Sequence, residues 1–198
     1  MFIEPHLGGK LGRERAGWIE VICGCMFSGK TEELIRRLNR AIIAKQKVEI
    51  FKPATDKRYH NTEIVSHNEN AIRSTPVNFA SDILLLAGDC DVVGIDEAQF
   101  FDESIVEISN TLANAGKRVI IAGLDMDYEG KPFGPMPFLL AVAEFVTKVH
   151  AICARTGELG SFSFRLSEHE GQVMLGEKKE YEARSRRAFM DAMKERKK

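Results

Sequence analysis

A glycine-rich segment between an apolar run and an amphipathic stretch sharply limits the folds open to this chain. Residues 24–31 read Gly-Cys-Met-Phe-Ser-Gly-Lys-Thr and match the pattern G-x-x-x-x-G-K-[ST] in full. The apolar run 18–23 before it predicts a buried strand, and apolar residues at helical spacing after it predict a helix over 31–45. Backbone N–H groups at such a strand-to-helix turn can surround a phosphate. We therefore expect Lys30 to contact β- and γ-phosphates and Thr31 to ligate Mg²⁺.

Strands and helices alternate along most of the chain. Predicted strands cover 47–51, 63–66, 71–74, 91–95, 117–122 and 147–152, and predicted helices cover 81–87, 104–114 and 138–145. This alternation is typical of an α/β fold with a parallel sheet flanked by helices, and the motif at 24–31 predicts that it is a P-loop NTPase fold. From Cys153 the pattern changes to short glycine-broken segments, followed by a charged helix from about Tyr181. We divide the chain into a flexible leader (1–16), a P-loop core (17–149) and a small lobe (150–198).

Composition describes an ordinary globular protein. Hydrophobic residues make up 44% and charged residues 29% of the 198 residues, with a formal net charge of -1. Near-neutrality argues against a dedicated nucleic-acid footprint, and no apolar stretch approaches the roughly 20 residues of a membrane-spanning helix. We expect a cytoplasmic protein with free thiols, because no secretory segment is apparent and the cysteines lack a disulfide framework spacing.

An acidic pair follows the predicted strand 91–95, at the carboxyl edge of the sheet, where α/β folds bind ligands. Asp96 fits a Mg²⁺ ligand, and Glu97, pointing to the other face, is a candidate base. The tetrapeptide 96–99, Asp-Glu-Ala-Gln, also resembles the motif of helicase ATPases, so a nucleic-acid-responsive or regulatory ATPase is an open alternative. Length weighs against a motor, since such proteins generally join two ATPase cores. No Asn-Lys-x-Asp tetrad for guanine occurs.

Four motifs, in order and at family spacing, resemble the type II thymidine kinases, the cytosolic group that includes the human enzyme. They are the glycine-rich loop 24–31, the segment 51–59, the segment 96–101, and 123–125 with 131–134. The resemblance runs from about Trp18 to Phe189. It implies Mg²⁺-dependent transfer of the γ-phosphate of ATP to the 5′-hydroxyl of thymidine or deoxyuridine. It also implies a homotetramer with no nucleic-acid or membrane partner.

The resemblance assigns roles position by position. Glu97 would take the proton of the 5′-hydroxyl, and Asp96 would hold Mg²⁺ with Thr31. ATP and phosphate contacts fall on Gly24, Met26, Phe27, Ser28, Gly29, Lys30, Thr31, Asp56 and Arg58. Nucleoside contacts fall on Met26, Phe100, Leu124, Tyr128, Phe133, Ser163, Met174, Gly176 and Tyr181. Arg165 is a further candidate for phosphate oxygens.

The small lobe departs from the family at its zinc site. Most members hold a structural zinc with two Cys-x-x-Cys pairs, but here only Cys153 remains, and the other positions are Thr156, Ser185 and Ala188. One thiolate cannot make a tetrahedral zinc site. We expect a zinc-ribbon-like lasso lobe without zinc, held by apolar packing and by hydrogen bonds from Thr156 and Ser185. An inactive relative is the remaining alternative. In the loop, Cys25 replaces a common proline and is expected to be buried and inert.

Overall fold

The computed structural model describes residues 17–54, 63–65, 71–166 and 180–196, and a six-stranded sheet lies at its centre. The strand order is β5-β2-β6-β7-β1-β8, and every neighbouring pair is parallel. The strands are β1 (Trp18–Cys23), β2 (Val48–Pro53), β5 (Thr75–Val77), β6 (Val92–Ile95), β7 (Arg118–Gly123) and β8 (Phe145–Lys148). The predicted parallel sheet flanked by helices is confirmed.

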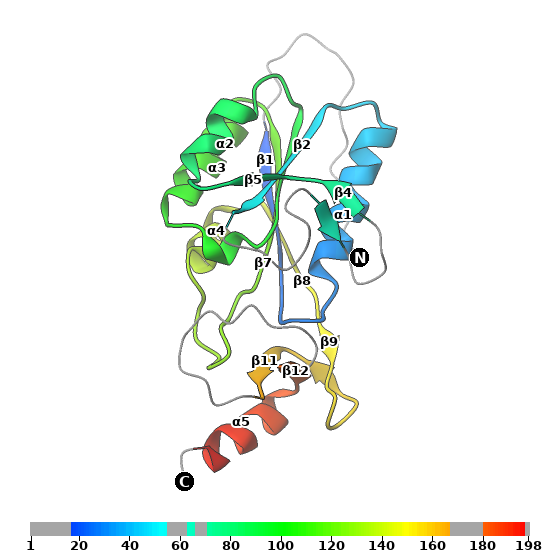
Figure 1. Ribbon diagram of the computed structural model, residues 1–198, viewed down its shortest axis with the longest axis vertical. Helices are drawn as coiled ribbons and strands as arrows, with labels where there is room; N and C mark the ends of the chain where they lie inside the picture. The colour runs from blue at the N-terminus through cyan, green and yellow to red at the C-terminus, as the bar shows by residue number, and fades with distance from the viewer. Residues whose placement is uncertain (1–16, 55–62, 66–70, 167–179, 197–198) are drawn as a thin grey trace.

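Helices cover both faces of this sheet, as Figure 1 shows. One face packs on α1 (Lys30–Ile43), and the other packs on α2 (Ser81–Leu86), α3 (Ser104–Asn114) and α4 (Met136–Val142). Successive strand residues point to opposite faces: Ile120 packs with the α1 side, whereas Val119 and Ile121 pack with the other helices. Two hydrophobic cores therefore hold the sheet rigidly, with the strand ends at a common edge.

A buried charged cluster ties α1 to the sheet. The Glu20 carboxylate accepts hydrogen bonds from Arg37 Nη1 (2.8 Å), Arg118 Nε (2.6 Å) and the Trp18 indole N–H (2.7 Å). Glu20 and Arg37 are fully buried and Arg118 is 3% exposed. Removing one partner of such a pair strongly destabilises the folded protein, because the remaining charge stays buried without compensation. The cluster joins β1, β7 and α1, and α1 begins at the glycine-rich loop.

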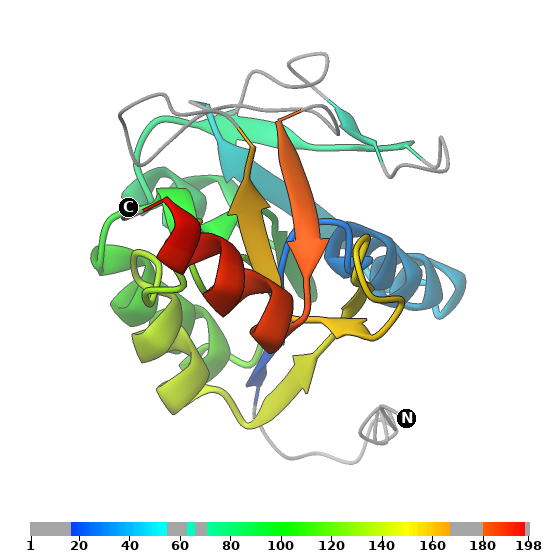
Figure 2. The ribbon, with the colours of Figure 1, turned by 90° about the horizontal axis from the view of Figure 1, so that it is seen from below.

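The described residues after β8, 149–166 and 180–196, are called the small lobe, and Figure 2 shows them from below. Its elements are β9 (Ala151–Ile152), β10 (Leu159–Gly160), β11 (Phe162–Arg165), β12 (Tyr181–Arg184) and α5 (Arg186–Glu195). The strands pair antiparallel, β9 with β10 and β11 with β12. The prediction of a helix from about Tyr181 was wrong. Tyr181 and Ala183 face inward on the strand β12, and the helix begins only at Arg186. Likewise, the predicted strand 147–152 is divided between β8 and β9.

Aromatic stacking forms the core of the lobe. The Phe162 and Phe189 rings stack with centroids 4.6 Å apart, and Phe164 meets Phe189 edge-on at 6.1 Å. The Arg184 guanidinium carbon lies 3.5 Å from the Phe164 centroid. Each such contact contributes on the order of 0.5–1.5 kcal/mol beyond its buried area. The predicted apolar packing of the lobe is confirmed.

Two of the positions expected to replace zinc ligands lie close together. Thr156 Oγ1 lies 3.4 Å from Ser185 Oγ, as expected for these two hydroxyls. Burial opposes ionisation of the Cys153 thiol, but hydrogen bonds from the Thr156 hydroxyl and from the backbone N–H groups of Ser185, Arg155 and Thr156 lower its pKa to about 6. The lobe thus brings Cys153, Thr156 and Ser185 together without a second thiolate among them.

Some predictions lie outside the described residues. They include the leader 1–16 and the turn between β3 (Glu63–Val65) and β4 (Ala71–Arg73), the two strands of the predicted hairpin. Within the described ranges, no helix has the length and apolar character needed to cross a membrane. The division of the chain into two domains at residue 149 stays a prediction.

Candidate active site

The glycine-rich loop lies between the end of β1 and the start of α1. Gly24 has φ +149°, and a Cβ there would come within 2.2 Å of the Val149 carbonyl oxygen, so this turn requires glycine. Gly29 caps α1, and no side chain caps the helix. The first N–H groups of α1 therefore face the loop and are available to an anionic ligand.

Polar side chains of the loop converge on the Cys25 carbonyl oxygen. Lys30 Nζ donates to it at 2.8 Å, and Ser28 Oγ donates at 2.7 Å. Lys30 is only partly buried, and its ammonium group lies against the backbone of the loop. A phosphate held by the loop would meet this charge directly, so the predicted position of Lys30 suits phosphate binding.

The acidic pair stands beside the loop, at the end of β6. Asp96 is 6% exposed; its Oδ2 lies 3.3 Å from Thr31 Oγ1, and its Oδ1 accepts the Glu97 N–H at 2.9 Å. A hydroxyl and a carboxylate meeting in this way supply the oxygen donors that Mg²⁺ prefers. The residues predicted to hold Mg²⁺ are thus adjacent, although they come from different elements.

Glu97 has an unusual backbone. Its φ of 53° and ψ of 40° are left-handed, a conformation that costs a non-glycine residue about 1–3 kcal/mol and is concentrated at functional sites. The half-buried carboxylate accepts a hydrogen bond from Gln99 Nε2 at 2.5 Å. Gln99 belongs to the short helix η1 (Ala98–Phe100), and its Oε1 accepts the Leu124 N–H at 3.0 Å. Although Gln99 is part of the predicted motif, the sequence indicated no separate role for it.

Two contacts join the loop to the small lobe. The Met26 N–H donates to Ser163 Oγ at 3.0 Å, and Cys25 Sγ donates to the Gly160 carbonyl oxygen at 3.2 Å. Cys25 is buried, and burial raises the pKa of its thiol. The buried position and raised pKa expected of an unreactive thiol are therefore found. Phe27 packs against this same junction.

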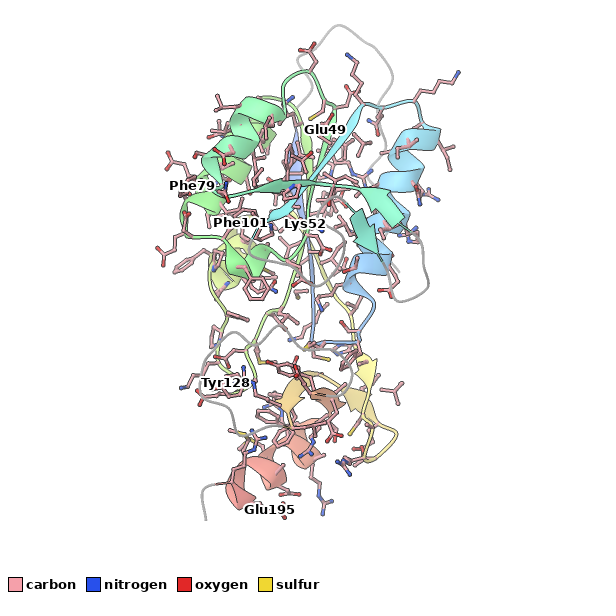
Figure 3. The ribbon with its side chains drawn as sticks, in the orientation of Figure 1. Glu49, Lys52, Phe79, Phe101, Tyr128 and Glu195 are labelled. Atoms are coloured by element: carbon pink, nitrogen blue, oxygen red, sulfur yellow. The ribbon has the colours of Figure 1, made fainter. Side chains whose placement is uncertain are left out.

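The candidate nucleoside residues form two aromatic groups. Phe100 and Phe133 meet edge-on, with centroids 5.7 Å apart. Tyr128 lies in the loop after β7, at the border of the small lobe, as Figure 3 shows. The Arg165 guanidinium carbon lies 3.8 Å from the Tyr128 ring centroid, and Arg165 Nε donates to the Tyr181 hydroxyl at 3.0 Å.

Arg165 is 1% exposed and is engaged with these two tyrosines. Its contact with phosphate oxygens, for which the sequence made it a candidate, stays a prediction. Four other candidates lie outside the described residues: Asp56, Arg58, Met174 and Gly176.

The parallel sheet, the loop that precedes α1 and the acidic residue at the carboxyl end of β6 are together consistent with an α/β fold of the P-loop NTPase class. A family model described as thymidine kinase matches residues 17–189. The chain belongs to the thymidine kinase family. It is therefore an ATP-dependent kinase.

Curated relatives agree with the family model. The thymidine kinase of Rhodothermus sp. is 64% identical over 173 residues, which cover 87% of this chain and 81% of the relative. That of Bacteroides fragilis is 55% identical over 195 residues, covering 98% and 96% of the two chains. That of Porphyromonas gingivalis is 64% identical over 167 residues, covering 84% and 82%. A solved DNA replication initiation factor is similar at 20% identity and a TM-score of 0.42, over 67% of this chain and 40% of that one, which is too weak to support an argument.

Proposed function

We propose that this chain transfers the γ-phosphate of ATP to the 5′-hydroxyl of thymidine or deoxyuridine, giving the nucleoside monophosphate and ADP. One observation carries the proposal: Thr31 on the phosphate loop contacts Asp96, and the next residue along the chain is the partly exposed carboxylate of Glu97. An anion site and a candidate base therefore lie beside each other. Family membership supplies the nature of the acceptor.

Phosphoryl transfer depends mainly on positioning and on neutralising charge. In the proposed reaction, the loop N–H groups and Lys30 bind the β- and γ-phosphates. Glu97 takes the proton from the 5′-hydroxyl, and the 5′-oxygen forms a bond to the γ-phosphorus. The bond between that phosphorus and the β–γ bridging oxygen breaks at the same time, and ADP leaves. Mg²⁺, held through Thr31 and Asp96, would neutralise charge on the phosphates.

The contacts between loop and lobe support a shared site for donor and acceptor. The hydrogen bond from the Met26 N–H to Ser163 Oγ holds the phosphate loop next to the strand β11. Phe100, Leu124, Phe133, Tyr128 and Tyr181 are proposed to enclose thymine. Backbone groups near Met174 and Gly176 are proposed to hydrogen-bond the base as a closing lasso. We further propose a RecA-like core, a homotetramer and a cytoplasmic location, which family membership supports.

A panel of acceptors tests this function. Purified protein with ATP and Mg²⁺ is offered thymidine, deoxyuridine, deoxycytidine or single-stranded polynucleotide, and ADP release is followed. We expect release with thymidine and deoxyuridine only. Release that responds to polynucleotide and ignores nucleosides would instead favour the regulatory ATPase suggested by the residues 96–99.

Replacing Arg165 by Lys should weaken thymidine binding. Lysine lacks the planar group that stacks on Tyr128 and cannot reproduce the directed Nε bond to Tyr181. We expect the KM for thymidine to rise roughly 10-fold and the KM for ATP to change little, a loss of about 1.4 kcal/mol. Arg155→Lys, on the exposed side of the same lobe, is the control. An equal rise in both KM values would show that Arg165 does not serve the nucleoside pocket.

Metal analysis should find zinc far below one equivalent per chain. Cys153, Thr156 and Ser185 are close together but include only one thiolate. The combined substitutions Thr156→Cys, Ser185→Cys and Ala188→Cys should restore binding of one zinc ion, because tetrahedral zinc needs four such ligands. Stoichiometric zinc in the unmodified protein would contradict this prediction.

A further inference from the structure

We infer that Gln99 is a positioning residue that holds the Glu97 carboxylate toward the acceptor hydroxyl and ties it to the wall of the nucleoside pocket. The inference rests on the proposed function, in which Glu97 is the base. Gln99 is 3% exposed, and both ends of its amide are bonded: Nε2 to Glu97 Oε2 at 2.5 Å and Oε1 to the Leu124 N–H at 3.0 Å.

The orientation of this amide follows from its partners. The Leu124 backbone N–H can only donate, so it must face the amide oxygen. The NH₂ group is then left facing the Glu97 carboxylate, which accepts from it when ionised. Because the Leu124 backbone fixes one end of the side chain, the other end is a donor in a set place. A single buried side chain thereby links the end of β6 to the segment after β7.

The backbone around Gln99 is also closely packed. Gly134 has φ +50°, and a Cβ there would lie 2.3 Å from the Gln99 carbonyl oxygen. This approach places the segment that carries Phe133 against Gln99, whose neighbour Phe100 meets Phe133 edge-on. The main chain of Gln99 thus supports the aromatic wall. The Gln99 side chain, by contrast, ends on Glu97 and the Leu124 N–H.

The hydrogen bond from the Gln99 side chain matters because the Glu97 backbone is left-handed and the Glu97 side chain is only partly buried. A flexible carboxylate on such a turn samples several rotamers, and few of them aim at a given hydroxyl. A fixed hydrogen bond reduces that freedom. The effect of Gln99 should therefore fall on turnover, whereas thymidine and ATP binding should be spared.

Two variants of Gln99 distinguish positioning of the Glu97 carboxylate from support of the pocket wall. Gln99→Met loses both hydrogen bonds at similar size, whereas Gln99→Glu keeps an acceptor for the Leu124 N–H and replaces the donor to Glu97 by a second carboxyl group, which repels the Glu97 carboxylate. We expect both variants to lower kcat by roughly 10- to 100-fold while the KM values for ATP and thymidine change by less than about 3-fold. Gln46→Met, at the opposite edge of the sheet, is the matched control and should retain normal kcat.

A double-mutant cycle completes the test. If Gln99 acts through Glu97, adding Gln99→Glu to Glu97→Gln should change kcat by less than about 2-fold. Two results would overturn the inference and leave Glu97 as the base. In one, the losses of kcat from Glu97→Gln and Gln99→Glu multiply in the double mutant; in the other, Gln99→Glu has normal kcat and only Gln99→Met loses it. Near-normal turnover in Glu97→Gln alone would contradict the proposed function and the inference with it. Thermal melting of each variant shows whether a loss of kcat reflects unfolding.

Discussion

Lys30→Ala is expected to lower kcat for thymidine phosphorylation by about 10²- to 10³-fold, because the variant loses the only side-chain cation of the glycine-rich loop 24–31. In the protein, the ammonium group lies 2.8 Å from the Cys25 carbonyl oxygen of the loop. A bound γ-phosphate develops charge on its oxygens during transfer, and alanine supplies nothing to stabilise that charge. Steady-state kinetics with saturating ATP and thymidine measure the effect.

The folded structure should tolerate this substitution, since Lys30 is partly exposed and begins α1, where alanine is a good helix former. Lys47→Ala removes an exposed cation at the far edge of the sheet and should leave kcat normal. A Lys30→Ala protein that melts like the original and still phosphorylates thymidine at a comparable rate would show that the loop does not bind the transferred phosphate.

Glu97→Gln is expected to lower kcat by about 10²- to 10⁴-fold, the range for loss of a general base. The amide cannot take the proton of the 5′-hydroxyl, yet its oxygen can still accept the hydrogen bond from Gln99 Nε2. The substitution therefore removes the base while leaving the local structure in place. Binding of ATP, followed by titration with a fluorescent nucleotide, should be unchanged.

Glu103→Gln provides the matched control for Glu97→Gln. Glu103 is exposed, next to the first residue of α3, and close in sequence to the acidic pair. Its variant should turn over normally. If Glu97→Gln matched this control in kcat, the base would have to be another group, and Glu97 would keep only a structural place in the turn.

Local patterns predicted the elements that local forces determine. The helix α3 begins and ends at the predicted residues, Ser104 and Asn114, because its apolar spacing and the glycine that follows set both ends. The strands β1, β6 and β7 fall within two residues of prediction, since continuous apolar runs mark buried parallel strands. Thr31 and Asp96 were likewise predicted to hold the same Mg²⁺ ion, because the loop after β1 and the acidic pair after β6 both lie at the carboxyl edge of the sheet, with β7 between the two strands.

Elements that depend on distant partners were missed. The strand β5 contains Pro76 and takes its place only at the edge beside β2, a position that tolerates a residue without an N–H. The strand β12 lies in a charged stretch that resembles a helix, and pairing with β11 decides its conformation. The Glu20 cluster joins residues up to 98 positions apart, so no window of sequence reveals it.

Contacts between residues far apart in the sequence were also missed in the site. The loop and the acidic pair are contiguous motifs, so their chemistry could be read directly. The hydrogen bond from the Met26 N–H to Ser163 Oγ spans 137 positions, and the one from the Leu124 N–H to Gln99 Oε1 depends on β6 and β7 being neighbours in the sheet. In the lobe, Thr156 and Ser185 are bonded as expected, because the family resemblance had already placed these two positions together.

Following the γ-phosphate of ATP tests the account most directly. The protein is incubated with ATP labelled at the γ-phosphate, Mg²⁺ and thymidine, and the products are separated and treated with a 5′-nucleotidase. We predict that the label appears in thymidine 5′-monophosphate and is released by the nucleotidase. With Glu97→Gln under the same conditions, we predict that the label enters this nucleotide about 10²- to 10⁴-fold more slowly. Label found only in inorganic phosphate, with thymidine unchanged, would contradict the assignment of this site as a thymidine-phosphorylating centre.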